Sequence, residues 1–543
     1  MPRFRMFTAM GIGLLMALAS GAVRAAEGSA GAPVNLPALN PPAATAARAR
    51  QLLSAGQTDR AERMVRAALA SGADDSLLCL SGEIQFRRAN FPEAARAYQA
   101  AIALNPDNAR AYWGLGRIEQ ANFRGLRARD LFSKAFALNH RDTDIILAYA
   151  DFVTDPASKS ILLDNVARLA SLDRPERTAR AVAQRQIHQR LQGRTPSRLA
   201  SPYAVYRLPL TGFRPNTSAE DGLLVSARIN GGKPLSLLLD TGARGIVIDA
   251  RAARNLALET IVASRLAGFG DTGAGESRVA LARTVAFGDL AFEECLVEVS
   301  GRSLTIGADG VLGADVFGRF KIGVDAQARV LQLTPFEDPA ATPPDRTPSI
   351  MTARFGTNAN PLADARGSDR SPDGVPSGPG GVALNSTSSH GRRPSARAPW
   401  VDPWVDLMAG SPTSVAAVGM RNLLLVKARV EGGKEGLFLV DTGAAFTAVS
   451  REYLPPALQP GHPVELLGAQ GPLSGAFRAG PLTFRVGGLP LVENAPLAMD
   501  LRPISQLEGI DIAGILGYSM LSKSPFTIDL RTGIVEFARL ASH

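Results

Sequence analysis

The pattern of hydrophobic and polar positions changes its period along the chain. From residue 46 to 195, apolar residues recur at helical spacing and strand-forming residues are few, which predicts an all-α region. From 200 to 337, and again from 410 to 541, short apolar runs are separated by glycine-containing turns, which is typical of β-strands. Residues 338–400 are rich in Pro and Gly and predict a disordered linker, as does the Ala-, Pro- and Gly-rich stretch at 26–45.

Small and aromatic residues repeat within the helical region at a period of 34 residues. Ala94 corresponds to Ala128, and Tyr98 corresponds to Phe132. This period, with small residues where paired helices cross and an aromatic side chain between them, resembles the tetratricopeptide repeat. The resemblance implies a stack of helix pairs that offers a concave surface to a substrate or a protein partner, and a spacer or internal brace is an equal alternative. We expect this region and the β-rich units to fold separately.

The two β-rich units contain similar sequences around Asp-Thr-Gly. These are LLLDTGARGIVID at 237–249 and FLVDTGAAFTAVS at 438–450, so Asp240 and Asp441 stand 201 residues apart. The upstream segments VSARINGGK and VKARVEGGK repeat at the same offset. A fixed offset marks a duplicated structural unit, here a strand, a Gly-Gly turn, a second strand and then Asp-Thr-Gly. A further Asp-Thr-Gly at 271–273 follows a glycine-rich stretch instead of an apolar strand, and the tripeptide alone is a weak signal.

A second motif follows each of these two aspartates at a matched distance. GVLGADVFGRFKIGVD begins at Gly310 and GILGYSMLSKSPFTID begins at Gly514, which is 70 and 73 residues after Asp240 and Asp441. Two motifs at matched spacing, each present twice, resemble the lobes of the pepsin and retropepsin family of aspartic proteases. The resemblance implies a multidomain protein in which an all-α tetratricopeptide-like region is followed by two mainly-β, retropepsin-like lobes.

The resemblance also implies a catalytic pair made of Asp240 and Asp441. Hydrolysis of a peptide bond without a metal or a nucleophilic side chain needs one carboxylate to activate a water and another acid to protonate the departing group. Two carboxyls held about 3 Å apart cannot both ionise, so they share one proton. The residues that would support the active-site loops in such a protein are Thr241, Gly242, Thr442 and Gly443.

The two lobes differ from the family and from each other. Residues 268–275 and 466–475 correspond to flaps over the site, and both lack the tyrosine that pepsins place there. Arg244 stands beside the first Asp-Thr-Gly where the second has Ala445. The sequence therefore predicts an electrostatic difference between the two halves of the site.

Composition and charge narrow the functions further. The 543 residues are 45% hydrophobic and 20% charged, as in ordinary soluble proteins of several domains. The net charge of +9 comes from dispersed residues without an aromatic-interleaved basic stripe, so nucleic-acid binding is not predicted. The five His show no paired metal spacing, and Cys79 and Cys295 fall in different units. We therefore predict no metal site, no cofactor and no disulfide framework.

The N-terminus has the parts of a secretory signal peptide. Arg3 and Arg5 precede an apolar core at 10–19, and a small-residue cleavage pattern ends at Ala25. The sequence therefore predicts a periplasmic or secreted protein that keeps no stable membrane span once residues 1–25 are removed.

Three functions remain open at this level. The first is an exported aspartic endopeptidase that acts on polypeptides, with helical repeats that select a substrate or a partner. The second is a non-catalytic binding or scaffold protein with degenerate lobes, although Asp-Thr-Gly is intact in both. The third is a chaperone-like assembly factor dominated by its repeats. The sequence also leaves open whether the lobes pair within one chain or between chains, and whether a propeptide masks the site.

Overall fold

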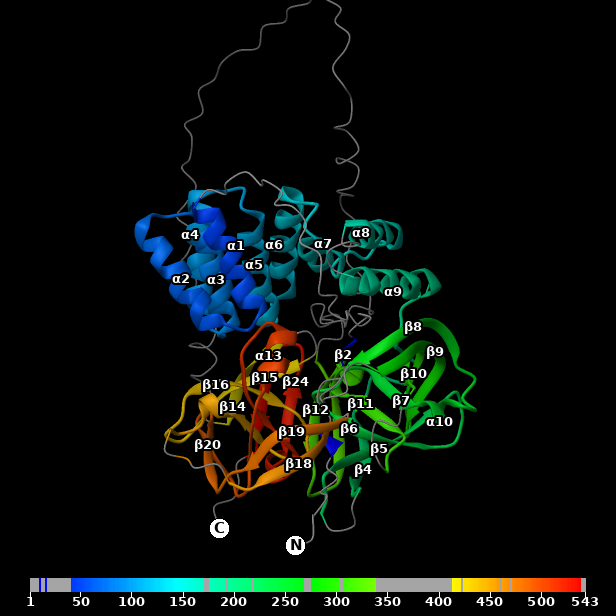
Figure 1. The fold of residues 1–543 in the computed structure, drawn as a ribbon. Coiled ribbons are helices and arrows are strands. Elements are labelled where there is room, and N and C mark those ends of the chain that lie inside the picture. Colours follow the sequence, from blue (N-terminus) through cyan, green and yellow to red (C-terminus); the bar gives the residue numbers. More distant parts are fainter. Residues whose placement is uncertain are drawn as a thin grey trace, which may run out of the picture.

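The computed structural model places a stack of helices against two β-rich lobes that lie side by side (Figure 1). It describes residues 9–10, 15–16, 41–169, 175–191, 194–215, 219–267, 275–301, 307–337, 413–420, 423–456, 458, 461–468 and 471–538. The predicted order, an all-α region followed by a large mainly-β region, is confirmed. The predicted linker lies outside the described residues. In the part of the chain that the structure describes, no helix has the length and apolarity needed to cross a membrane.

The helical region is built from successive antiparallel helix pairs. Its helices are α1 (Pro41–Ser54), α2 (Thr58–Ser71), α3 (Asp75–Arg87), α4 (Phe91–Leu104), α5 (Ala109–Ala121), α6 (Gly125–Leu138), α7 (Thr143–Ala150), α8 (Pro156–Leu169) and α9 (Pro175–Leu191). Helix α1 begins five residues before the predicted start at 46, so the end of the stretch predicted to be disordered is helical. Proline is well tolerated in the first turn, because its missing N–H would have no partner within the helix there.

The 34-residue period corresponds to the pairs α3–α4 and α5–α6, and close packing explains why its repeated residues are small or aromatic. A Cβ added to Gly82 or Gly114 would lie 2.6 Å or 2.3 Å from the ring of Tyr98, and one added to Gly116 would lie 2.6 Å from the ring of Phe132. Real Cβ atoms do not approach other atoms so closely. Glycine is therefore required where an aromatic side chain fills the crossing between helices.

The duplicated phrase folds into the same local structure twice. Lobe 1 contains β4 (Tyr206–Phe213), β5 (Gly222–Ile229), β6 (Leu235–Asp240), β7 (Ile246–Asp249), β8 (Glu259–Ala267), β9 (Gly275–Phe287), β10 (Leu290–Ser300) and β11 (Gly310–Gly313). Lobe 2 contains β14 (Ser414–Met420), β15 (Leu423–Val430), β16 (Glu435–Val440), β17 (Ala448–Ser450), β18 (Pro463–Gly468), β19 (Gly471–Arg478), β20 (Leu482–Val486), β21 (Leu489–Glu493), β22 (Leu497–Met499) and β23 (Ile512–Leu516). Strand β6 pairs in parallel with β11, as β16 does with β23.

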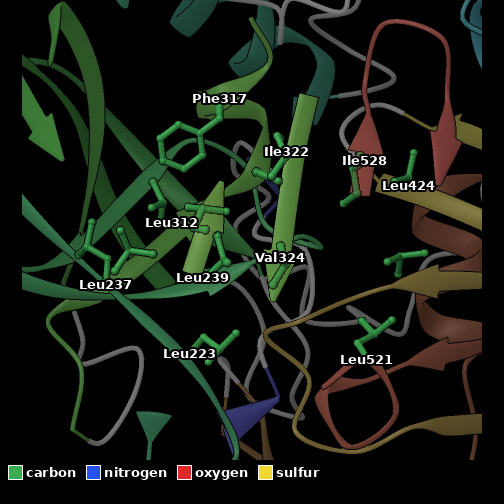
Figure 2. Packing of buried hydrophobic residues seen from close by; sticks show 14 of the residues in the cluster. Leu223, Leu237, Leu239, Leu312, Phe317, Ile322, Val324, Leu424, Leu521 and Ile528 are labelled. Atoms are coloured by element: carbon green, nitrogen blue, oxygen red, sulfur yellow. The ribbon is translucent and has the colours of Figure 1, made fainter. Parts of the chain in front are cut away.

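A shared antiparallel sheet joins the two lobes within one chain. Its additional strands are β12 (Phe320–Asp325), β13 (Val330–Pro335), β24 (Phe526–Asp529) and β25 (Ile534–Phe537), and the order is β4-β13-β12-β24-β25-β14. At its centre Ile322 of lobe 1 lies opposite Ile528 of lobe 2. Figure 2 shows this pair inside a hydrophobic core that extends from Leu239 and Leu312 on one side to Leu424 on the other.

The helical region also shares a hydrophobic core with lobe 2. Phe86, Tyr98 and Ile118 belong to one buried cluster with residues of lobe 2 such as Leu425 and Ile512. The expectation that the helical and β-rich parts fold separately therefore changes, because each covers apolar surface of the other. The helical pattern could show which positions are buried, but it could not show that part of the buried surface belongs to another domain.

Polar contacts fix the orientation of the helices on lobe 2. The backbone N–H of Asp511 donates to the carbonyl of Arg87 at 2.6 Å, and Arg87 Nε donates to the Asp511 carboxylate at 3.3 Å. The ring of Phe123 lies against Gly533, where an added Cβ would approach within 2.2 Å. Arg87 is the last residue of α3 and Phe123 follows α5, so the C-terminal ends of two helices contact lobe 2.

Candidate active site

Two buried strand pairs hold the sequence-predicted aspartates. Asp240 is the last residue of β6, and Asp441 directly follows β16. Both strands are apolar and buried because the second motif pairs beside them, with Gly313 in register with Asp240. A Cβ on Gly310 would lie 2.1 Å from the carbonyl oxygen of Val247, so only glycine allows this strand to pass so close behind the loop.

The structure brings the two aspartates together at the junction of the lobes. Asp240 is 1% exposed and Asp441 is 0% exposed. A Cβ on Gly443 would lie 2.3 Å from Cγ of Asp240, and a Cβ on Gly242 would lie 2.8 Å from Cγ of Asp441. Each loop therefore packs its glycine against the carboxyl of the other lobe. Asp240 Oδ1 accepts the N–H of Gly242 at 2.8 Å, while Asp441 Oδ1 accepts those of Gly443 at 2.9 Å and Ala444 at 3.1 Å.

The two predicted threonines form a symmetric set of hydrogen bonds across the lobes. The N–H of Thr241 donates to Oγ1 of Thr442 at 3.1 Å, and the N–H of Thr442 donates to Oγ1 of Thr241 at 3.0 Å. Each hydroxyl also donates to a strand of the opposite lobe, at the carbonyls of Val440 (2.7 Å) and Leu239 (2.8 Å). These bonds are buried, and they lock the two loops in one relative position.

Burial governs the electrostatics of the pair. It raises the pKa of Asp441 to about 7 and the pKa of Asp240 well above its ordinary value, and the neighbouring carboxyl raises the latter further. The backbone N–H groups of the loops oppose these shifts without cancelling them. Because two adjacent buried carboxylates repel each other, the pair retains one shared proton and titrates as a unit.

The electrostatic difference predicted from Arg244 involves further residues that the sequence did not reveal. Asp315 lies within the second motif of lobe 1, and its Oδ1 accepts the N–H of Gly245 at 2.8 Å. Burial raises the pKa of Asp315, and the hydrogen bond from Gly245 and the charge of Arg244 partly offset this. In lobe 2 the neutral hydroxyl of Ser519 takes the corresponding place and accepts the N–H of Thr447 at 3.1 Å. A charged side chain, Asp315, therefore binds the loop that follows Asp240, where lobe 2 has a neutral hydroxyl.

A second cross-lobe contact was also missed by sequence reasoning. The hydroxyl of Tyr518, in the second motif of lobe 2, donates to the carboxylate of Glu220 in lobe 1. Arg329 binds the same carboxylate with two hydrogen bonds of 2.6 Å each. Burial is the largest single influence on the pKa of Glu220 and would raise it, but the arginine and tyrosine donors together outweigh burial and hold this pKa below its ordinary value. This network ties the lobes together behind the aspartates.

Comparison with known families agrees with this geometry. Residues 225–316 match the family model for aspartyl proteases, and residues 82–121 match the model for the TPR repeat. The chain carries an aspartyl protease-like domain and TPR repeats. The protease model covers most of lobe 1, from β5 to the second motif, so lobe 2 is assigned through the internal duplication.

Known structures resemble the chain only distantly. The crystal structure of an aspartic proteinase from Irpex lacteus is 13% identical, with 62% of this chain and 98% of that chain covered and a TM-score of 0.32. An O-GlcNAc transferase mutant from Thermobaculum terrenum is 23% identical, with 24% of this chain and 25% of that chain covered and a TM-score of 0.20. No curated protein matches the chain. The assignment of the protease-like and TPR parts therefore rests on the two family models and on the topology.

Each predicted flap is part of a β-hairpin of the protease-like lobes. Strands β8 and β9 form the hairpin of lobe 1, whose predicted tip at 268–274 lies outside the described residues. Strands β18 and β19 form its counterpart in lobe 2. Two short N-terminal strands pair with these hairpins: β1 (Ala9–Met10) lies parallel to β18, and β2 (Leu15–Met16) lies antiparallel to β8. Both hairpins can thus hydrogen-bond an added extended chain.

Replacing Asp441 by Asn should stabilise the protein at neutral to basic pH. The folded pKa of Asp441 is raised from 3.8 to about 7, so the folded state binds more protons than the unfolded state between these values. Its contribution to stability is therefore lost as pH rises through this window, and Asn carries no charge to bury. We expect the thermal midpoint of Asp441→Asn at pH 8 to rise by about 2–4 °C, with little change at pH 4.

Differential scanning calorimetry at both pH values checks this expectation. Asp289→Asn is the matched control, because Asp289 is an exposed carboxylate of the same protease-like region. Equal midpoint changes in the two variants at pH 8 would show that Asp441 is not held in a destabilised charged state.

Proposed function

We propose that this protein is an exported aspartic endopeptidase, in which Asp240 and Asp441 activate a water that attacks the peptide bond. The observation that carries the proposal is the meeting of these two buried carboxyls, each on an Asp-Thr-Gly-Ala loop from one lobe. A protein that only binds partners has no need of two adjacent acids whose burial costs stability.

The chemistry follows from one shared proton on the pair. The ionised carboxylate removes a proton from the water as its oxygen bonds to the peptide carbon, and the protonated carboxyl gives its proton to the carbonyl oxygen. The tetrahedral intermediate then breaks its C–N bond as the carboxyl that took the water proton gives it to the departing nitrogen. The other carboxylate takes a hydroxyl proton of the intermediate, so that the acid product forms and the pair again holds one proton. The hydrogen bonds between Thr241 and Thr442 keep the two acids in position through both steps.

An extended polypeptide is the substrate that the hairpins favour. The pairing of β1 with β18 and of β2 with β8 supports a binding mode in which backbone hydrogen bonds from both lobes hold a strand. The TPR repeats support a further role in protein–protein interaction, either with the substrate or with a partner. Export, and cleavage after Ala25, remain part of the proposal and can be tested by N-terminal sequencing of the native protein.

Hydrolysis of an unfolded protein tests the proposed activity. We expect cleavage that a statine-type transition-state mimic abolishes and a metal chelator does not. Calorimetric titration with the same mimic measures whether it binds to the lobes, and this distinguishes a peptidase from a non-catalytic scaffold. Binding of an unfolded chain without cleavage at any pH between 3 and 8 would favour the scaffold alternative instead.

Removal of residues 1–25 should increase the proposed activity. The strands β1 and β2 occupy edges of both hairpins that an extended substrate would use. A tethered strand competes at an effective concentration on the order of millimolar, so we expect kcat/KM to rise about tenfold when it is removed. The full chain with Met10→Pro and Met16→Pro is the matched variant, because proline removes the strand N–H groups and keeps the length. Equal kcat/KM values for all three proteins would contradict competition by this segment.

A further inference from the structure

The last helix of the TPR-containing region packs on the protease-like lobe 1. The first half of α9 contacts the helical stack, where Ala181 shares a buried cluster with α7 and α8. Its last two turns still contact α8, where His188 Nε2 lies 3.2 Å from the carbonyl oxygen of Pro156. On lobe 1 the same turns bury Ile187 and Leu191, which are 3% and 4% exposed. Their buried neighbours there are Val279 and Leu281 of the hairpin strand β9. Partly buried residues of lobe 1 complete this cluster, namely Ile261, Val262 and Leu296.

Polar contacts surround this apolar patch and fix its register. Arg190 pairs with Glu259 at the start of β8. Arg194 pairs with Glu294 at 2.7 Å, and the N–H of Ser197 donates to the carbonyl of Glu294 at 3.0 Å. Exposed ion pairs add little stability each, so the apolar contact holds α9 in place and the polar contacts orient it.

This apolar patch occurs in lobe 1 and is absent from the corresponding strand of lobe 2. Val279 lies opposite Glu298 of β10, as Arg478 lies opposite Leu497 of β22. Strands β10 and β22 each pair in parallel with the strand that follows Asp-Thr-Gly, so Arg478 is the counterpart of Val279. Two residues further on, lobe 2 has Gly480 where lobe 1 has Leu281. Lobe 1 therefore carries apolar side chains where its duplicate does not, and α9 covers them.

The same face of the sheet continues toward the catalytic loop of lobe 1. Glu298, opposite Val279, is buried, and its carboxylate accepts a hydrogen bond of 2.6 Å from Ser277 on β9. The charge of Arg244 lies close enough to lower the pKa of Glu298, against the larger effect of burial. Arg244 follows Asp240 by four residues. The buried face that α9 covers thus extends along the hairpin to Glu298, whose carboxylate lies within electrostatic range of Arg244 in the loop of Asp240.

We propose that α9 is a positioning element for the β8–β9 hairpin, through which the TPR-containing region sets the affinity of the site for its peptide. The proposal rests on the proposed peptidase function. Ile187 and Leu191 hold the hairpin from its outer face, and they act on the substrate only through it. A ligand that moves α9 on the helical stack would change peptide binding without contacting the aspartates.

Hydrogen exchange of the full chain tests the contact independently of catalysis. Leu191→Ala should speed exchange of the backbone amides of β8 and β9 by about tenfold, because the buried side chain is lost from one side of the hairpin. Ile187→Val should have a smaller effect in the same strands. Leu77→Ala is the matched control, because Leu77 is 1% exposed within the helical stack and lies in a cluster formed by α1, α2 and α3, away from α9. It should leave exchange in the hairpin unchanged.

Peptide kinetics test whether the contact of α9 with the hairpin affects substrate binding. Leu191→Ala should raise KM by about three- to tenfold with kcat within about twofold, since the acids are untouched and only substrate binding weakens. Leu191→Met, which conserves volume, should restore both KM and hairpin exchange. Unchanged exchange in β8 and β9, or equal changes in Leu77→Ala, would overturn the proposal. If no variant cleaves peptide, the proposed activity fails while the exchange data still decide the mechanical role of α9.

Discussion

Asp240→Asn and Asp441→Asn, each alone, are expected to lower kcat/KM for peptide hydrolysis by at least about 10³-fold. The reaction needs one ionised and one protonated carboxyl, and Asn can neither accept the proton of the water nor carry the shared proton. The amide has nearly the shape of the acid, so the loops held by Thr241 and Thr442 should remain intact. Steady-state kinetics with a fluorogenic peptide measure the loss, and Asp289→Asn, at an exposed position of lobe 1, is the control.

Mixing the two variants tests which lobes form the site. In this structure one chain supplies both lobes, with Ile322 opposite Ile528 in the shared sheet and Tyr518 bonded to Glu220 across the junction. We therefore expect the mixture to be as inactive as its components. Recovery of activity would show that unlike lobes pair between chains, and substantial activity in either single variant would show that like lobes pair between chains.

The sequence was sufficient to predict the parts of the fold that repeat. In both the Asp-Thr-Gly motif and the second motif, an apolar strand leads to a glycine. A buried pair of parallel strands such as β6 and β11 requires this pattern. The same motif predicted Asp240 and Asp441 as a pair, because two lobes of the same fold that face each other bring their corresponding loops together. The TPR pattern could also be predicted from the sequence, because the ring of Tyr98 leaves room only for glycine at the two positions that it contacts.

Contacts that occur once could not be predicted in this way. Glu220 and Asp315 stand in segments without a repeated counterpart of the same chemistry, and only the folded chain brings them to Tyr518 and Gly245. The apolar residues of β9 that α9 covers follow the ordinary alternation of a half-buried strand. Such a pattern tells which face is buried and cannot tell what buries it.

A chain that begins at Ser201 is expected not to form stable lobes, contrary to the separability that the sequence pattern suggested. Lobe 2 and helices α3 to α5 contribute to one buried cluster, and Phe123 belongs to the core that joins the lobes. Removing residues 1–200 would expose these faces to water at about 25 cal/mol for each Å² of apolar surface. Because folded domains are stable by only about 5–15 kcal/mol, this loss should unfold lobe 2 or leave it aggregating.

Circular dichroism melting and dye binding compare the truncated chain with the full one. We expect the truncated chain to melt at least about 10 °C below the full chain, or to show no cooperative transition. Supplying residues 41–200 as a separate chain should partly restore its stability. Phe123→Ala in the full chain should cost about 3–5 kcal/mol and loosen lobe 2. Phe152→Ala is its control, since Phe152 is 8% exposed beside 7% for Phe123 but packs only within the helical stack. A truncated chain that melts at the temperature of the full chain would show that the lobes are complete without the helices. The shared core makes the opposite result the expected one, because the apolar faces of lobe 2 and of the helical stack are buried only against each other.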